Sequence, residues 1–158
     1  MPNQAPHLDS ARALRDAIRV LIVAHGALDD ARRPCGARMP RMHAWALLEL
    51  HAHGPLSVNR LAERLAIDRT NVSRLCARLV EEGQVTRVWS AEDRRRREIA
   101  LTEAGRKAAA AVDASSADFF ERVRARLGER AGAVEAALKA LAEALPDSAA
   151  ADVTGGAA

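Results

Sequence analysis

The chain has 158 residues, 49% of them hydrophobic and 3% aromatic, with a formal net charge of +3 and two cysteines. This length suits a single domain with a core of its own, and the alanine-rich, tyrosine-free composition favours helices. There is no signal-peptide pattern and no apolar run of membrane-spanning length, and the two cysteines do not form a disulfide framework, so we expect a cytoplasmic protein.

The N-terminal third of the chain predicts two helices. Residues 1–8 are polar, contain two prolines and are expected to form a flexible end. A first helix is predicted to begin near Asp9 or Ser10, and after a Pro- and Gly-rich loop a second helix is predicted from Arg41 to His53. The second helix is apolar on most sides and should be a central support. The apolar stripe of the first helix consists of Leu14, Ile18, Leu21, Ile22, His25 and Leu28.

Two short amphipathic helices follow, with the spacing of a helix-turn-helix. Ser57 and Asp68 are placed to cap them, only residues 66–68 separate them, and Gly83 is placed to end the second in a left-handed turn. Their predicted buried stripes are Val58, Leu61, Ala62 and Leu65 in the first, and Val72, Leu75, Cys76 and Leu79 in the second.

The opposite face of the second of these helices is small, polar and basic. At about 100° per residue, this face carries Thr70, Arg74 and Ala77, flanked by Asn71, Ser73 and Arg78. Such a surface, without a large apolar group, suits a helix that enters the major groove of DNA.

From Val85 the hydrophobic period changes from helical to alternating, which predicts a β-hairpin, or wing, whose tip presents four consecutive arginines, 94–97. An arginine at a hairpin tip fits a narrow minor groove, where the electrostatic potential is most negative. Between Arg60 and Arg97 there are ten arginines and six acidic residues, so the positive charge is focused on this region and indicates a polyanionic partner.

This stretch resembles the winged helix of the MarR family of bacterial transcription regulators. The matching residues are Leu61-Ala62, the block from Asn71 to Leu75, Gly83, Arg87, Asp93-Arg94-Arg95, and Leu101-Thr102 with Gly105. The resemblance implies a homodimer that binds double-stranded DNA under control of a small molecule or an oxidant. Two departures are Gln84, where an aliphatic residue is common, and Arg96-Arg97, which make the wing more basic than usual.

The resemblance also assigns roles. Thr70, Asn71 and Arg74 would read bases, with Ser73 on the same face. Arg95 would enter the minor groove, with Asp93 orienting it. Arg78 and Arg94 would contact phosphate.

Thr102 is placed to cap a long helix from Glu103 to about Leu127, which Gly128 interrupts before a last helix. The terminal helices have apolar stripes without a partner in a domain this small, so a second copy is expected to cover them. The stripe of the long helix comprises Ala108, Ala111, Val112, Ser115, Phe119 and Val123, and that of the last helix Val134, Leu138, Leu141 and Leu145.

The predicted fold is therefore mostly α with a small β-hairpin wing. A winged helix-turn-helix DNA-binding region spans 40–102, a helical dimerisation region comprises 9–33 and 103–145, and 1–8 and 146–158 form flexible ends.

Other functional residues are open to more than one interpretation. The resemblance makes His25, His43 and Trp45 candidates for a pocket that takes an aromatic or apolar effector, although a histidine in an apolar stripe is more often a hydrogen-bonded core residue. Cys35, beside basic residues, is a candidate redox sensor or an incidental thiol. A third alternative is a winged helix that binds protein instead of DNA. Neither catalytic pairs nor metal-ligand spacing stand out, so no enzyme activity, metal or cofactor is predicted.

Overall fold

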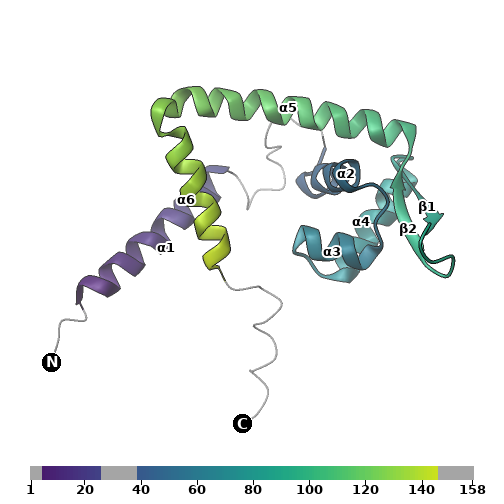
Figure 1. Cartoon of the computed structure of the whole chain (residues 1–158), viewed down its shortest axis with the longest axis horizontal. Coiled ribbons are helices and arrows are strands. Elements are labelled where there is room, and N and C mark those ends of the chain that lie inside the picture. The colour runs from purple at the N-terminus through teal and green to yellow at the C-terminus, as the bar shows by residue number, and fades with distance from the viewer. Residues whose placement is uncertain (1–4, 26–38, 146–158) are drawn as a thin grey trace, which may run out of the picture.

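The computed structural model describes residues 5–25 and 39–145 (Figure 1). The two strands that lie within these ranges pair as one antiparallel hairpin, and the predicted mostly helical fold with a β-hairpin wing is confirmed. The elements in chain order are α1 (Ala5–His25), α2 (Arg41–His53), α3 (Val58–Leu65), α4 (Arg69–Glu81), β1 (Val85–Trp89), β2 (Arg97–Leu101), α5 (Glu103–Leu127), the short 3-10 helix η2 (Gly128–Arg130) and α6 (Ala131–Ala144).

Helix α2 lies at the centre of the winged helix, as predicted. It contacts α3, α4, β2 and α5, and α5 runs across this group in Figure 1 while the hairpin projects at one end. Because most sides of α2 meet another element, its apolar residues are distributed around the helix rather than on one stripe. The largest of the fully buried side chains are Leu47, Leu50, Leu61, Val72, Cys76, Leu79 and Val85.

Helix α1 begins at Ala5, four residues before the predicted start, and so includes residues 5–8 of the segment expected as a flexible end. Pro6 lies in the first turn, where a missing N–H costs nothing because that group has no acceptor within the helix. The described part of the helix ends at His25, and Leu28 and the rest of the predicted 9–33 segment lie outside the described residues, as do 1–4 and 146–158.

Helix α5 has the predicted bounds, and its end at Gly128 is confirmed by a backbone φ of +57°. Its buried stripe differs by one position, because Ala109 is fully buried whereas Ala111 is exposed. The packing of α2 against α5 decides which face of α5 is buried. This packing cannot be predicted from the sequence of α5 alone. Beyond Val112 the stripe is only partly buried, since α2 no longer lies against it.

The end of α4, the base of the wing and the start of α5 meet at one junction. The hydroxyl of Thr102 donates to the carbonyl oxygen of Gly83 at 2.7 Å and accepts the N–H of Gly105 at 3.0 Å. The N–H of Thr102 donates to the carbonyl oxygen of Gln84 at 3.0 Å. Thr102 therefore caps α5, as predicted, and also ties it to the chain that leaves α4.

Gly105 makes this junction possible. A Cβ at this position would overlap the backbone carbonyl group of Gln84 and would press on the side chain of Leu101. Only glycine allows α5 to approach the end of α4 so closely, which gives a physical reason for the Leu-Thr-x-x-Gly pattern.

We expect Gly105→Ala to lower the free energy of unfolding by at least about 1–3 kcal/mol, because rigid backbone must move to admit the methyl group. Gly132→Ala is the matched control: nothing lies within 4 Å of a Cβ there, and alanine in a helix should raise stability by up to about 0.5–1 kcal/mol. Urea denaturation of both variants checks this, and equal stability of Gly105→Ala and wild type would contradict the junction as described.

Candidate nucleic-acid interface

Helix α4 begins at a fully formed cap. One carboxylate oxygen of Asp68 accepts the backbone N–H of Asn71 at 3.0 Å, and the other accepts the side-chain amide of Asn71. The hydrogen bond from the Asn71 backbone holds the pKa of Asp68 below its usual range, against a smaller opposing effect of desolvation. The predicted cap is confirmed, and it also fixes the side chain of a residue predicted to read bases.

The structure places the five predicted DNA-binding residues of α4 on one exposed face, while its apolar stripe is buried in the core. Asn71, Arg74 and Arg78 border a surface hollow between α4 and the start of α2. The residues of the exposed face are Thr70, Asn71, Ser73, Arg74 and Arg78. Their contact with DNA stays a prediction.

His43 lies on this side of the winged helix. It is buried, borders the same hollow, and its Nδ1 lies 3.6 Å from Oε2 of Glu82. The contact joins the start of α2 to the end of α4, so within this chain His43 supports the position of α4.

At the wing tip, Asp93 organises the backbone. Its Oδ1 accepts the N–H of Arg95 at 2.9 Å, its carbonyl oxygen accepts the N–H of Arg96 at 2.9 Å, and its Oδ2 lies 3.3 Å from Nε of Arg96. Asp93 thus holds Arg95 through the main chain, while its ion pair is with the side chain of Arg96. The side chains of Arg94 and Arg95 are exposed.

One feature of the wing was not predicted. Trp89 and Arg97 are opposite each other in the antiparallel register, and the guanidinium carbon of Arg97 lies 3.8 Å from the centre of the indole ring. The alternating pattern of the strands places Trp89 and Arg97 on one face of the hairpin. Which residues of the two strands lie opposite each other depends on the length of the turn, and this register was not predicted from the sequence.

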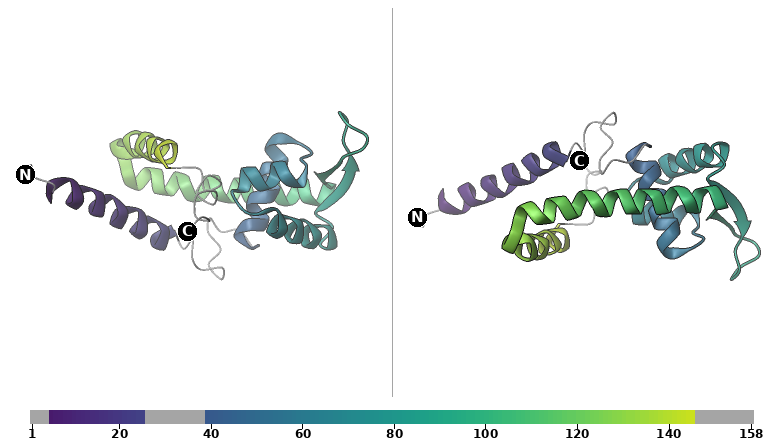
Figure 2. Two further views of the ribbon diagram at one scale, coloured as in Figure 1. Left: turned by 90° about the horizontal axis from the view of Figure 1, so that it is seen from below. Right: turned by 90° about the horizontal axis from the view of Figure 1, so that it is seen from above.

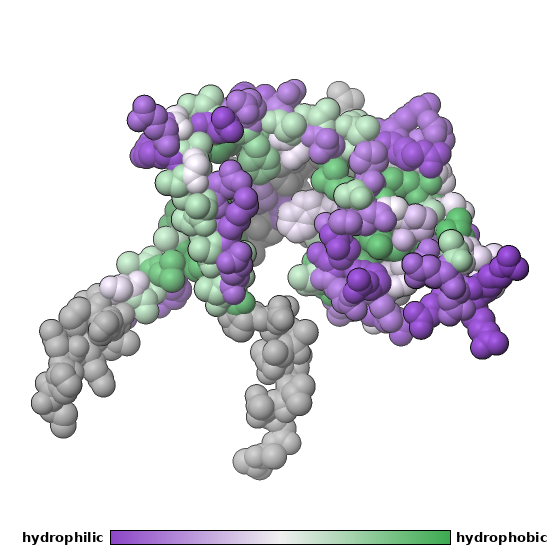
Figure 3. Space-filling model, in the orientation of Figure 1, coloured by the Kyte–Doolittle hydropathy of each residue, from purple (hydrophilic) through white to green (hydrophobic). Residues whose placement is uncertain are grey.

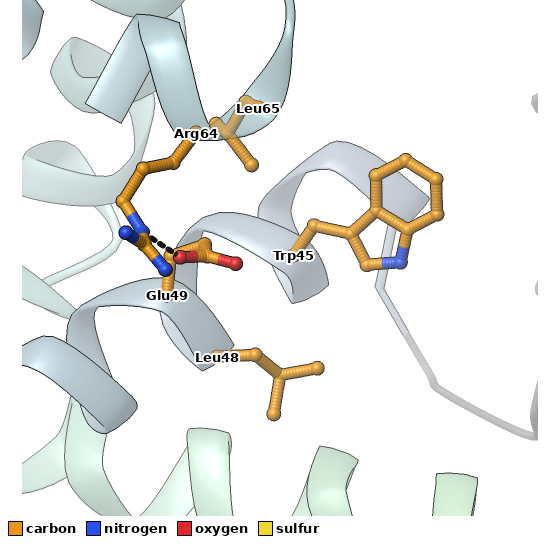
Figure 4. A pocket seen from close by; sticks show the side chains of 5 residues that line it. All are labelled: Trp45, Leu48, Glu49, Arg64 and Leu65. Carbon is orange, nitrogen blue, oxygen red and sulfur yellow. Dashed lines mark hydrogen bonds and ion pairs between the residues drawn. The ribbon is translucent and has the colours of Figure 1, made fainter. Parts of the chain in front are cut away.

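The three predicted effector-pocket residues lie in different places. Trp45 is exposed and borders a second hollow with Leu48, Glu49, Arg64 and Leu65 (Figure 4). In that hollow Arg64 contacts Glu49 and His53, which joins α3 to the end of α2. His43 lies on the side of α4, and His25 ends α1, which stands apart from the winged helix in Figures 1 and 2. A single chain therefore does not bring the three together.

The hollow beside Trp45 has a volume of about 250 Å³, which is below the range of about 300–1,000 Å³ typical of small-molecule sites. It would need a further wall to enclose such a ligand.

Cys76 is buried on the inner side of α4, as predicted, and burial raises the pKa of its thiol, although the charge of Arg87 offsets part of this. Cys35 lies outside the described residues, so its redox role stays a prediction. In the part of the chain that the structure describes, no three His, Cys, Asp or Glu side chains come together as metal ligands, and no helix has the length and apolar character to span a membrane.

Residues 39–96 match the model of the MarR family, which confirms the predicted resemblance for the winged-helix region. No curated protein matches the chain in sequence.

Solved structures extend the similarity to most of the chain. A MarR family transcriptional regulator from Silicibacter pomeroyi superimposes with a TM-score of 0.65 at 23% identity, over 90% of this chain and 93% of that one. NadR in complex with 4-hydroxyphenylacetate superimposes with a TM-score of 0.62 at 21% identity, over 92% of this chain and 100% of NadR. Staphylococcus aureus MepR, solved in complex with DNA, superimposes with a TM-score of 0.61 at 25% identity, over 68% of this chain and 80% of MepR. At these identities the likeness shows a shared fold.

Asp68→Asn tests the cap of α4 by its pH dependence, because asparagine also caps helices but does not titrate. The pKa of Asp68 is lower in the folded chain than the ordinary value of 3.8, so its stabilising effect is present above that value and is lost as the pH falls through the lower folded-state pKa. On acidification from about pH 5 to about pH 2 we expect the melting temperature of wild type to fall further than that of Asp68→Asn. Parallel pH profiles in thermal denaturation would show that the carboxylate does not stabilise the helix.

Proposed function

We propose that this chain, whose residues 39–96 match the MarR family, is a cytoplasmic, homodimeric transcriptional regulator that binds double-stranded DNA and represses until a small molecule releases it. The observation that supports this most is the exposed face of α4, where small polar residues and two arginines lie beside a wing whose tip presents further arginines.

The arrangement suits simultaneous contact with both grooves. Helix α4 would enter the major groove, with Thr70, Asn71 and Arg74 near base edges and Arg78 near a phosphate. The wing would place Arg95 in the adjacent minor groove and Arg94 against the backbone. MepR, which has a similar fold, was solved in complex with DNA, and this supports DNA as the partner. A basic wing argues against the alternative of a winged helix that binds protein.

A homodimer is supported by apolar side chains that the single chain leaves exposed. No residue of α6 is buried, and Leu138 and Leu145 are 44% and 54% exposed. On α1, Leu21 and Ile22 are 49% and 38% exposed. Apolar surface lies along these two helices in Figure 3, whereas the surface of the wing is hydrophilic. Burial of these side chains against a second copy would remove them from water.

Twofold symmetry of the dimer would impose symmetry on its DNA. The two recognition helices would contact half-sites roughly one helical turn, about 10 bp, apart, so the operator is expected to be palindromic.

The effector is proposed to be a small aromatic or apolar molecule. The hollow beside Trp45 is open in the single chain, and the dimer would supply the missing wall, with His25 at the end of α1 as one candidate. NadR, which has a similar fold, holds 4-hydroxyphenylacetate in its solved structure. A ligand that binds one spacing of the two recognition helices more tightly than another would shift the population away from the DNA-binding form.

Arg74→Ala and Arg95→Ala separate base contact from groove contact. A bidentate base contact supplies about 1–3 kcal/mol of discrimination, so Arg74→Ala should reduce the ratio of affinities for operator and scrambled DNA. Arg95→Ala should lower the affinity for operator and for scrambled DNA by the same factor. It should also reduce the slope of log affinity against log salt concentration by about one unit. Fluorescence anisotropy across a salt series, with DNA from the intergenic region beside the gene, provides the measurement.

The same assay repeated with phenolic and aromatic acids tests release by an effector. If Arg74→Ala loses the same factor of affinity for operator and for scrambled DNA, α4 does not read bases through Arg74. If the wild-type chain does not bind DNA, the proposed function is wrong.

Replacement of Leu138 and Leu141 by Asp should convert the dimer to a monomer or an unfolded chain, because two charges would lie in the proposed interface. Sedimentation velocity measures the oligomeric state, and circular dichroism separates dissociation from unfolding. Lys139→Ala, on the same helix and in contact with Glu135, is the control and should leave the dimer intact. A stable dimer of the double Asp variant would exclude α6 from the interface.

A further inference from the structure

The wing contains an arginine that is positioned by an aromatic ring. The guanidinium carbon of Arg97 lies 3.8 Å from the centre of the Trp89 ring, and the indole itself is 57% exposed. We call this pair the wing stack. An indole face attracts a cation through its quadrupole, while the N–H groups at the edge of the guanidinium remain able to donate hydrogen bonds outward.

The four wing arginines differ in their contacts. Arg96 pairs with Asp93, so a neighbouring carboxylate partly compensates its charge. Arg97 has no carboxylate within ion-pair distance among residues 39–145, and its contact with Trp89 orients it without neutralising it. Arg94 borders the surface hollow of about 370 Å³ that Trp89 also lines. The wing stack therefore presents a fixed, uncompensated positive charge beside a second one.

The wing stack lies on the face of the hairpin that turns towards α4. Side chains at alternate positions of a strand share a face, and on this face Val85 and Ile99 are buried in one core cluster with Leu79 of α4. Trp89 and Arg97 extend that face beyond the core. Because Trp89 and Arg97 are the last paired residues before the wing tip, DNA that contacts the tip would pass close to them.

We propose that Arg97, held in place by Trp89, binds a backbone phosphate of the DNA at the side of the wing, in addition to the minor-groove contact of Arg95. This rests on the proposed function and extends it. A phosphate is the expected partner because the guanidinium lies over the ring and its N–H groups can donate to an acceptor that approaches from solvent. Trp89 is a positioning residue that does not itself need to touch the DNA.

Affinity for a duplex of arbitrary sequence, measured across a salt series, tests the proposal because a phosphate contact does not depend on sequence. Arg97→Gln should weaken binding and reduce the salt slope by about 0.9. Trp89→Ala removes no charge, yet it should weaken binding by about two- to fivefold because Arg97 loses its orientation. Trp89→Phe, which keeps an aromatic face, should restore most of the affinity.

Two double variants distinguish positioning from a general effect on the wing. In an Arg97→Gln background, Trp89→Ala should cause no further loss, whereas in an Arg96→Gln background it should cause the same loss as in wild type. Circular dichroism and melting temperature confirm that each variant is folded, which is expected because Trp89 and Arg97 are exposed.

The possible results separate this inference from the function on which it rests. Equal losses from Trp89→Ala in both backgrounds, or a change in melting temperature without a change in affinity, would overturn the wing stack as a DNA contact and leave the proposed function intact. Absence of DNA binding by the wild-type chain would overturn both.

Discussion

The contact between the end of α4 and the start of α5 is the constraint on which the other features depend. It is fixed by hydrogen bonds from the hydroxyl and the N–H of Thr102 to the carbonyl oxygens of Gly83 and Gln84, and by the missing Cβ of Gly105. The chain between these two points forms the wing, so the junction sets the base of the hairpin as well as the direction of α5. Helix α4, the wing and α5 are consequently oriented relative to one another by short contacts of the Thr102 hydroxyl and of the backbone at one junction.

Local contacts of polar and aromatic side chains then order the chain at each place where we expect it to contact DNA. Asp68 orders the first turn of α4, Asp93 orders the tip of the wing, and the indole of Trp89 orders Arg97. In each case a short-range contact reduces the freedom of a side chain or turn before binding, which lowers the entropy cost of forming the complex. Asn71 is an exception, because its amide is already engaged with Asp68 and would have to share or exchange that bond to read a base.

Features encoded by neighbours in sequence were predictable, and features that depend on distant packing were not. The caps at Ser57, Asp68 and Thr102 and the buried stripe of α4 follow from local periodicity and side-chain chemistry. The burial of Ala109 in place of Ala111 depends on how α2 meets α5. The Trp89–Arg97 pair depends on strand register. The candidate effector residues His25, His43 and Trp45 do not converge in one chain, because their relative positions depend on how the helices that carry them pack together.

The length of α5 has a mechanical consequence. Its 25 residues, at about 1.5 Å each, form a rod of roughly 37 Å that joins the exposed apolar end of the chain to the junction with the wing. A tilt of about 5° at the far end would displace the winged helix by roughly 3 Å over that length. This is close to the rise of about 3.4 Å per base pair, so in the proposed dimer a small rotation at the far end of α5 would be enough to move each copy of α4 out of step with its proposed half-site.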